Sequence, residues 1–171
     1  MRKKRFFTYI WLIGAVFLAK AEAGSGYITK IESYFIGNLI ASPYDCSLDV
    51  KVVQSSKGQE FFIVITKPSG TVADDQIAVI PALEFIDLVR AIPELSMRPF
   101  PIADYFQRRY TYDNFSFSFG PFGRYSELQY SMTMDSRLKN STVMFLNESS
   151  FQSVFEAAIK KVFELDSKTK Q

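Results

Sequence analysis

The chain has 171 residues, of which 47% are hydrophobic and 22% charged, as in an ordinary globular protein. This composition excludes a wholly disordered chain, a collagen-like repeat and a disulfide-stabilised miniprotein. With no histidine and one cysteine, the chain lacks the residues of histidine-dependent nucleophilic triads and of the usual zinc sites. Neither a G-x-x-x-x-G-K-S/T nor a G-x-G-x-x-G phosphate-binding motif occurs. We therefore expect no catalytic residue, no metal and no cofactor.

The first 23 residues have the three parts of a secretory signal peptide. Basic residues from Arg2 to Arg5 precede an apolar run from Phe6 to Ala19, and Ala21-Glu22-Ala23 has the small-x-small pattern of a cleavage site. A membrane span needs about 20 apolar residues, so this shorter run favours a cleaved leader over the alternative, an uncleaved anchor. We expect cleavage before Gly24 and an exported protein, periplasmic or secreted, with no transmembrane segment after cleavage.

Removing the leader changes the charge of the protein. The full chain carries 20 basic and 18 acidic residues; residues 1–23 hold five basic and one acidic, which leaves 15 basic and 17 acidic residues, a net charge of −2. Non-specific nucleic-acid binding depends on an excess of cations that contact phosphate. The mature charge therefore disfavours nucleic acid as a partner, although a local basic patch would still permit it.

The first half of the mature chain predicts strands followed by a helix. Residues 28–40 fit either a helix or a strand, because apolar residues recur at helical spacing while Gly37 and several isoleucines oppose a helix. Ser55-Ser56-Lys57-Gly58 predicts a turn, and Pro93 is expected to end the helix. The strands are predicted at 48–52, 61–65 and 77–80, and the helix at 82–92.

The second half predicts the same order after a proline-containing connector at 96–107. Gly120-Pro121-Phe122-Gly123 predicts a turn, and Ser149 with Gln152 predicts a capping box at the start of the last helix. That helix carries an apolar stripe through Phe155, Ile159 and Phe163. The strands are predicted at 110–119, 128–134 and 143–146, and the helix at 151–163.

The two halves predict an internal duplication. Strand, strand, strand and helix follow one another over about 46–95 and again over about 108–165, with an offset near 68 residues. We therefore expect an α+β fold with two tandem repeats, in which antiparallel sheets carry helices packed on one face. Residues 24–171 are expected to form a single domain.

The junction Val79-Ile80-Pro81-Ala82-Leu83-Glu84-Phe85 runs from a strand into a helix. With the order of elements over about 46–165, it resembles the repeat of the Whirly and PUR group of single-strand-binding proteins. Those proteins use tandem sheet-then-helix repeats and often oligomerise. The resemblance implies a single-stranded nucleic-acid binder.

A second resemblance follows if residues 28–40 are helical. The order then is similar to type III secretion chaperones and YbjN-like sensory regulators, and Tyr112 to Met134 followed by Asn147 to Leu165 resembles their C-terminal half. Such domains bind extended protein segments and have no active site. This resemblance implies a protein-binding or peptide-binding module.

An aromatic segment flanked by arginines is the candidate ligand-binding site. Single-strand binders stack bases on such rings and hold phosphate with arginine; the alternative is a core-facing row whose arginines extend to the surface. A bulge near Asp113-Asn114 would put the tyrosines and the phenylalanines on one face. The candidate ligand-binding residues are Arg108, Arg109, Tyr110, Tyr112 and Arg124, beside Phe115, Phe117 and Phe119.

Three further features remain as candidates. The row Phe61, Ile63 and Ile65 needs a cover, which a second molecule could supply, so it is a candidate interface. Cys46 is expected to be buried and inert, with pairing between chains as the alternative. Asp74 and Asp75 could bind Ca²⁺ or act with Asp49 as acid and base, although a solvated loop explains them as well.

The sequence thus favours an exported, non-catalytic binding module for a protein or peptide, chaperone-like or regulatory. A homo-oligomer is compatible with it. The alternative is a single-stranded nucleic-acid-binding protein of the Whirly or PUR type.

Overall fold

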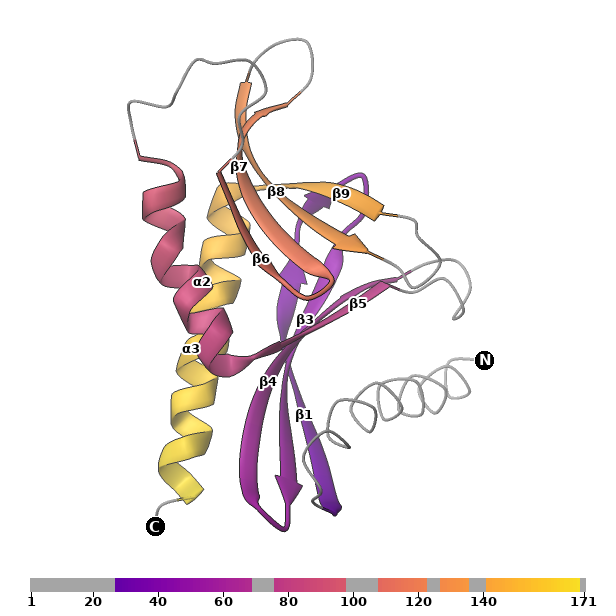
Figure 1. The fold of residues 1–171 in the computed structure, drawn as a ribbon, viewed down its shortest axis with the longest axis vertical. Helices are drawn as coiled ribbons and strands as arrows, with labels where there is room; N and C mark the ends of the chain where they lie inside the picture. The colour runs from indigo at the N-terminus through magenta and orange to yellow at the C-terminus, as the bar shows by residue number, and fades with distance from the viewer. Residues whose placement is uncertain (1–26, 69–75, 98–107, 123–126, 136–140, 170–171) are drawn as a thin grey trace.

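The computed structural model describes residues 27–68, 76–97, 108–122, 127–135 and 141–169. The chain forms two groups of strands, and each group is followed by one helix (Figure 1). The elements are β1 (Ile28–Leu39), β2 (Ala41–Ser42), β3 (Cys46–Ser55), β4 (Gly58–Lys67), β5 (Gln76–Pro81), α2 (Ala82–Leu95), β6 (Arg108–Tyr112), β7 (Phe115–Phe122), β8 (Glu127–Asp135), β9 (Ser141–Leu146) and α3 (Glu148–Thr169).

Two antiparallel sheets and two helices make up the described chain, which confirms the predicted α+β class. The first sheet has the strand order β1-β3-β4-β5 and the second the order β2-β9-β8-β7-β6. The chain passes from the first sheet to the second directly after β1, because Ala41 and Ser42 of β2 pair with β9. The helices lie together on one side of the molecule (Figure 1).

Each helix contacts strands of both halves of the chain. Helix α3 follows β9 of the second sheet but lies against β1 and β3 of the first. Helix α2 follows β5 of the first sheet and also contacts β6 of the second. The approach of α3 to β1 is close at Gly37, where a Cβ atom would lie 3.3 Å from Cγ2 of Val154. The helices therefore hold the two sheets together.

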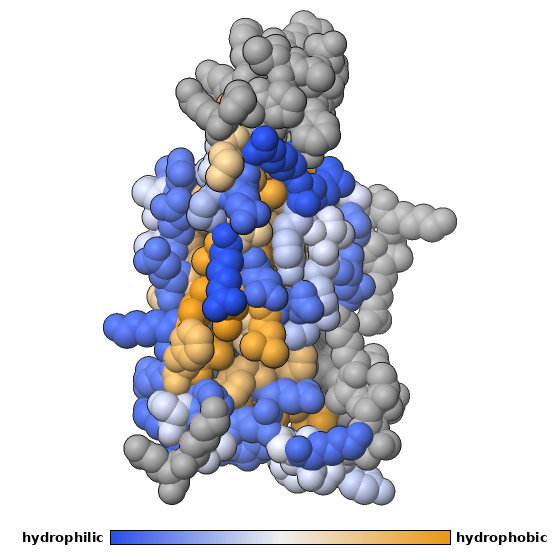
Figure 2. Space-filling view, turned by 60° about the vertical axis from the view of Figure 1, so that its left-hand side comes forward, coloured by the Kyte–Doolittle hydropathy of each residue, from blue (hydrophilic) through white to orange (hydrophobic). Residues whose placement is uncertain are grey.

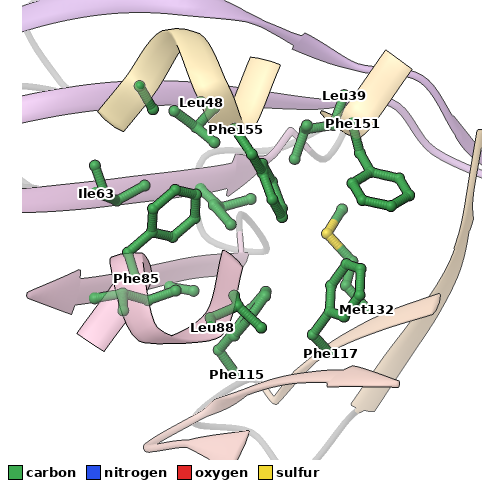
Figure 3. Close-up of a cluster of buried hydrophobic side chains, with 14 of the residues drawn as sticks. Leu39, Leu48, Ile63, Phe85, Leu88, Phe115, Phe117, Met132, Phe151 and Phe155 are labelled. Atoms are coloured by element: carbon green, nitrogen blue, oxygen red, sulfur yellow. The ribbon is translucent and has the colours of Figure 1, made fainter. Parts of the chain in front are cut away.

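One hydrophobic core joins both sheets and both helices. Phe85 of α2 meets Phe155 of α3 edge to face, with ring centroids 4.9 Å apart. Phe117 of β7 meets Phe151 of α3 in the same way at 5.4 Å. Figure 3 shows these rings with aliphatic side chains from the first sheet around them. The largest fully buried side chains are Phe85, Phe115, Phe117, Phe151, Phe155, Leu39, Leu48, Ile63, Ile65, Ile80, Leu88 and Met132.

The segment that fitted either a helix or a strand is strand β1. It pairs with β3 from Ile28 to Leu39, with irregularities between Ile28 and Lys30 and between Phe35 and Gly37. The first irregularity shifts the alternation, so Ile28, Ile31 and Phe35 face the same side although their spacing is helical. The helical spacing therefore came from an irregular strand.

The predicted helix end at Pro93 and the predicted turn at Gly120-Pro121-Phe122-Gly123 are both wrong. Helix α2 continues through Pro93 to Leu95. Strand β7 continues through Gly120 and Pro121 to Phe122 and pairs there with β8, where a turn was predicted. Pairing of β7 with β6 ends at Phe119. On that side of Pro121, therefore, no described strand is present, and a proline, which has no N–H to donate, is tolerated there.

Local backbone features explain the turn at Gly58 and the start of α3. Gly58 has φ 126° after the predicted turn, which a glycine adopts without strain. Helix α3 is capped by Asn147 rather than by the predicted Ser149, because the side-chain oxygen of Asn147 accepts the N–H of Ser150 at 3.2 Å. The helix runs to Thr169, six residues beyond the predicted end at Phe163.

Candidate binding surfaces

The predicted aromatic segment is a hairpin, not a single strand with a bulge. Asp113 and Asn114 turn the chain between β6 and β7, and Asp113 takes a positive φ of 49°. Tyr110 therefore pairs with Phe117, and Tyr112 with Phe115. Directly paired residues point to the same face, so the tyrosines and phenylalanines share one face, as expected, through a turn instead of a bulge.

The shared face points into the core. Phe115 and Phe117 are fully buried and Phe119 is buried, which confirms the core alternative for this row. Tyr110 and Tyr112 are half-buried and pack against the same core. The rings are therefore not a surface on which bases could stack.

Arg108 belongs to the scaffold of the fold. Its Nη1 atom donates hydrogen bonds to the carbonyl oxygens of Glu94 at 2.9 Å and Met97 at 2.8 Å, with Leu95 at 3.5 Å. Glu94 and Leu95 are the last residues of α2 and Met97 lies just beyond them, at the helix end that carries negative partial charge. The guanidinium therefore caps α2.

Tyr110 ties β6 to the start of α2. Its hydroxyl donates to the carbonyl oxygen and to the side-chain oxygen Oε2 of Glu84, each at 3.0 Å. Burial, together with the hydrogen bond to Glu84, raises the pKa of Tyr110 to about 12. This tyrosine remains neutral at neutral pH and holds two elements together.

The candidate ligand-binding residues do not form one site. Arg108, Tyr110 and Tyr112 face the core side of β6, whereas Arg109 lies on the opposite face, with its Nε atom 3.3 Å from Oγ of Ser118. Arg124 lies outside the described residues. The face of the sheet that carries Arg109 is hydroxyl-rich, because the register also places Thr111, Ser116, Ser118, Ser131 and Thr133 on it. Arg109 and Thr111 are exposed on this face, whereas Ser116, Ser118 and Ser131 are buried.

The candidate interface on β4 is part of the core. Ile63 and Ile65 are fully buried, and Phe61 is half-buried against the same cluster. Helix α2 contacts β4, so the chain itself supplies the cover for which a second molecule was expected. The opposite face of β4 is apolar as well, since Val64 is fully buried in a second cluster with Val53 and Val79.

Cys46 is buried, as predicted. Burial raises the pKa of its thiol to about 12, and its Sγ atom lies 3.3 Å from Sδ of Met144. A thiol with this pKa is not a thiolate at neutral pH and is a poor nucleophile. Cys46 is therefore a core residue.

A row of polar side chains on the outer face of the first sheet was missed from the sequence. Lys51 Nζ donates to Ser33 Oγ, and Ser33 Oγ lies 3.5 Å from Oδ1 of Asp49. Burial raises the pKa of Asp49 and lowers that of Lys51. The ammonium donates to the hydroxyl and the hydroxyl donates to the carboxylate, so the row fixes the orientation of Ser33. Asp74 and Asp75, the other predicted carboxylates, lie outside the described residues.

Strand β1 presents exposed apolar side chains beside this polar row. It is an edge strand of the first sheet, and Ile31 and Phe35 are 39% and 64% exposed. Both lie on the outer face with Ser33. The alternation of Ile31, Ser33 and Phe35 is a strand signal, but Ile28 three residues earlier gave the segment a helical spacing as well.

A second apolar surface lies on the side of the helices. Figure 2 shows hydrophobic residues gathered there and bordered by hydrophilic ones. The exposed apolar side chains of the two helices include Leu83 of α2, 76% exposed, and Phe163 of α3, 57% exposed. Phe163 was predicted to belong to the buried stripe of its helix, and its exposure corrects that prediction.

No protein-family model matches the chain, and neither does any curated protein. In the described ranges, no cluster of three or more cysteine, aspartate and glutamate side chains is placed to hold a metal ion. The described helices are too short or too polar for any of them to cross a membrane.

Proposed function

We propose that this protein is an exported, non-catalytic module that binds protein or peptide segments. The observation that carries the proposal is the apolar surface on the side of the helices, with Leu83 and Phe163 exposed. Contiguous exposed apolar surface on a folded domain commonly marks an interaction site. A leucine and a phenylalanine held on helices present that surface without a large loss of side-chain entropy on binding.

The border of this surface supports a protein partner. Helix α2 carries exposed Glu84, Asp87 and Arg90, and α3 carries exposed Lys160 and Glu164. An apolar centre with a rim of mixed charges is the usual anatomy of a protein–protein interface. The rim sets orientation, while the apolar centre supplies most of the affinity.

The test is binding of a labelled, permanently unfolded polypeptide, such as reduced and carboxymethylated lactalbumin, measured by fluorescence anisotropy. Leu83→Glu with Phe163→Glu is expected to weaken binding at least tenfold. Val143→Glu is the matched control, because Val143 is 41% exposed on β9, in the second sheet. Equal affinities of the double variant and the control, or the absence of binding by the unmodified protein, would contradict the proposal.

The alternative function, single-stranded nucleic-acid binding, has one observation in its favour. The order β1, β3, β4, β5, α2 and the order β6, β7, β8, β9, α3 are both four antiparallel neighbours followed by a helix. We propose that these are tandem repeats, each with one strand more than the sequence suggested. This order supports the resemblance to the sheet-then-helix repeats of the Whirly and PUR group.

Arg109 and Thr111, which are exposed on the hydroxyl-rich face of the second sheet, would contact a nucleic-acid strand. A labelled oligonucleotide at low and moderate salt tests this function, because phosphate contacts make affinity fall steeply with salt. We expect no tight binding at moderate salt. Micromolar binding that Arg109→Ala abolishes would replace the protein-binding proposal.

A further inference from the structure

Strand β1 has one side that no described element covers. It is twelve residues long and stands at the end of the first sheet, with β3 as its only neighbour among the described strands. Long edge strands with apolar side chains readily pair with a further strand, and proteins usually shorten, charge or cover them. In β1 the two charged side chains, Lys30 and Glu32, form a salt bridge with each other, so the pair carries no net charge that would repel the edge strand of another molecule.

We propose that two copies of this chain join through β1, antiparallel, about a two-fold axis at Ser33. In such a pair Ser33 faces the partner's Ser33, and Ile31 faces the partner's Phe35. The axis makes the second contact identical to the first, so both exposed apolar residues of each copy are covered. The outcome is one sheet of eight strands.

The register follows from charge and from the regular part of β1. Opposite residues must share a face, so the axis lies on one residue of the regular run between the two irregularities, which extends from Lys30 to Phe35. An axis at Glu32 would set two carboxylates against each other. An axis at Ile31 would place Phe35 opposite the irregular start of the partner's strand, so the Phe35 side chain would remain exposed.

The axis at Ser33 also matches polar groups on the other face. Glu32 there faces the partner's Tyr34. Within one chain the Tyr34 hydroxyl donates to Oε2 of Glu32 at 2.9 Å, so the same donor and acceptor are available across the axis. Backbone hydrogen bonds between the edges would supply affinity, as in other cases of strand addition. This dimer uses a different surface from the one proposed for partner binding.

Disulfide trapping tests the register. In the chain expressed with its own leader, Ser33→Cys is expected to form a disulfide-linked dimer under mild oxidation at least tenfold faster than Ile31→Cys. On the proposed axis the two thiols introduced by Ser33→Cys would be opposite, whereas those introduced by Ile31→Cys would be roughly 13 Å apart. Background is low because Cys46, the single native cysteine, is buried. Equal rates, or faster trapping by Ile31→Cys, would overturn the proposed axis.

Sedimentation tests the dimer without a cysteine. The unmodified protein is expected to sediment as a dimer, and Phe35→Lys as a monomer with an unchanged circular dichroism spectrum. Phe163→Lys is the control, since that side chain is also exposed but lies on α3, and it should remain dimeric. A monomeric unmodified protein at about 100 µM, or a dimeric Phe35→Lys variant, would overturn the proposed dimer. A dimer that fails to bind the unfolded polypeptide would instead contradict only the binding function proposed for the helix surface.

Discussion

Arg108 shows how much one side chain contributes to joining the two halves of the chain. It belongs to β6 but donates to carbonyls at the end of α2, including that of Glu94 at 2.9 Å. Hydrogen bonds from a charged donor contribute more than neutral ones, and a cation at this helix end also interacts favourably with the helix dipole. Arg109, next to it, makes its contact with Ser118 within the second sheet.

Arg108→Met is expected to lower the free energy of unfolding by about 1–3 kcal/mol, because the carbonyls at the end of α2 lose a charged donor. Urea denaturation followed by circular dichroism measures the change. Arg109→Met is the matched control and is expected to change stability by less than about 0.5 kcal/mol. Equal losses in the two variants would show that Arg108 does not stabilise the helix end.

The hydroxyl of Tyr110 predicts a dependence of stability on alkaline pH. Its pKa is raised to about 12 in the folded protein, from an ordinary value of 10.0, first by burial and then by the hydrogen bond to Glu84. A raised pKa means that the folded state holds the proton more tightly, so the contribution is complete below pH 10 and is lost between pH 10 and about 12. Tyr110→Phe removes this contribution at every pH.

The stability difference between the unmodified protein and Tyr110→Phe is therefore expected to be constant up to about pH 10 and to narrow above it. Urea midpoints measured in parallel at about pH 8, 10 and 11 test this, since the titration of the other tyrosines is common to both proteins. A difference that grows above about pH 10 would contradict the assignment.

Helix α3 is the element on which both sheets depend. Its buried residues are Phe151, Phe155, Ala158 and Val162. Near its start, Phe151 contacts Phe117 and Tyr130 of the second sheet, and farther along it Lys161 lies over the ring of Tyr34 in β1. A helix that packs on two sheets at once cannot loosen without opening both.

Phe155→Ala is expected to cost about 3–5 kcal/mol of unfolding free energy, because it removes a fully buried ring that contacts Phe85 and Phe117. Phe163→Ala on the same helix removes an exposed ring and is expected to cost less than about 0.5 kcal/mol. Urea denaturation compares the two. A loss below about 1 kcal/mol at Phe155 would show that α3 does not anchor the core.

At the scale of the whole molecule, the two halves are connected by exchanged contacts. Helix α3 of the second half lies on β1 and β3, and α2 of the first half reaches β6. Asn114, in the hairpin of the second sheet, donates to the carbonyl oxygens of Ile77 in β5 and Asp135 in β8. We infer that neither half would keep its core covered without the other.

We expect the mature protein to begin directly after the leader. Ala21-Glu22-Ala23 after the apolar run predicts a mature N-terminus at Gly24. N-terminal sequencing of the protein recovered from the exported fraction is expected to read Gly-Ser-Gly-Tyr. A mature chain that still begins with Met1 would contradict this and would favour an anchor.

Local pattern was sufficient to predict several elements. Alternation placed Phe115 and Phe117 on the buried face, because a strand has a period of two whatever lies against it. Spacing of three and four placed Phe155 on the buried face of α3 for the same kind of reason. The turn before Gly58 was predictable because few residues other than glycine adopt a positive φ without strain.

Contacts between distant segments decided the rest. Periodicity along the chain predicts which face of an element a side chain lies on, and therefore which side chains need burial. It does not predict what covers that face. Residues 28–39 form a strand because they pair with β3, and Ile63 is buried because the chain's own helix α2 packs against β4. The fold also separates Arg108 from Arg109, because Arg108 lies on the face of β6 that meets α2 and Arg109 lies on the opposite, hydroxyl-rich face of the sheet. Those outcomes depend on pairings across many residues, which no local pattern encodes.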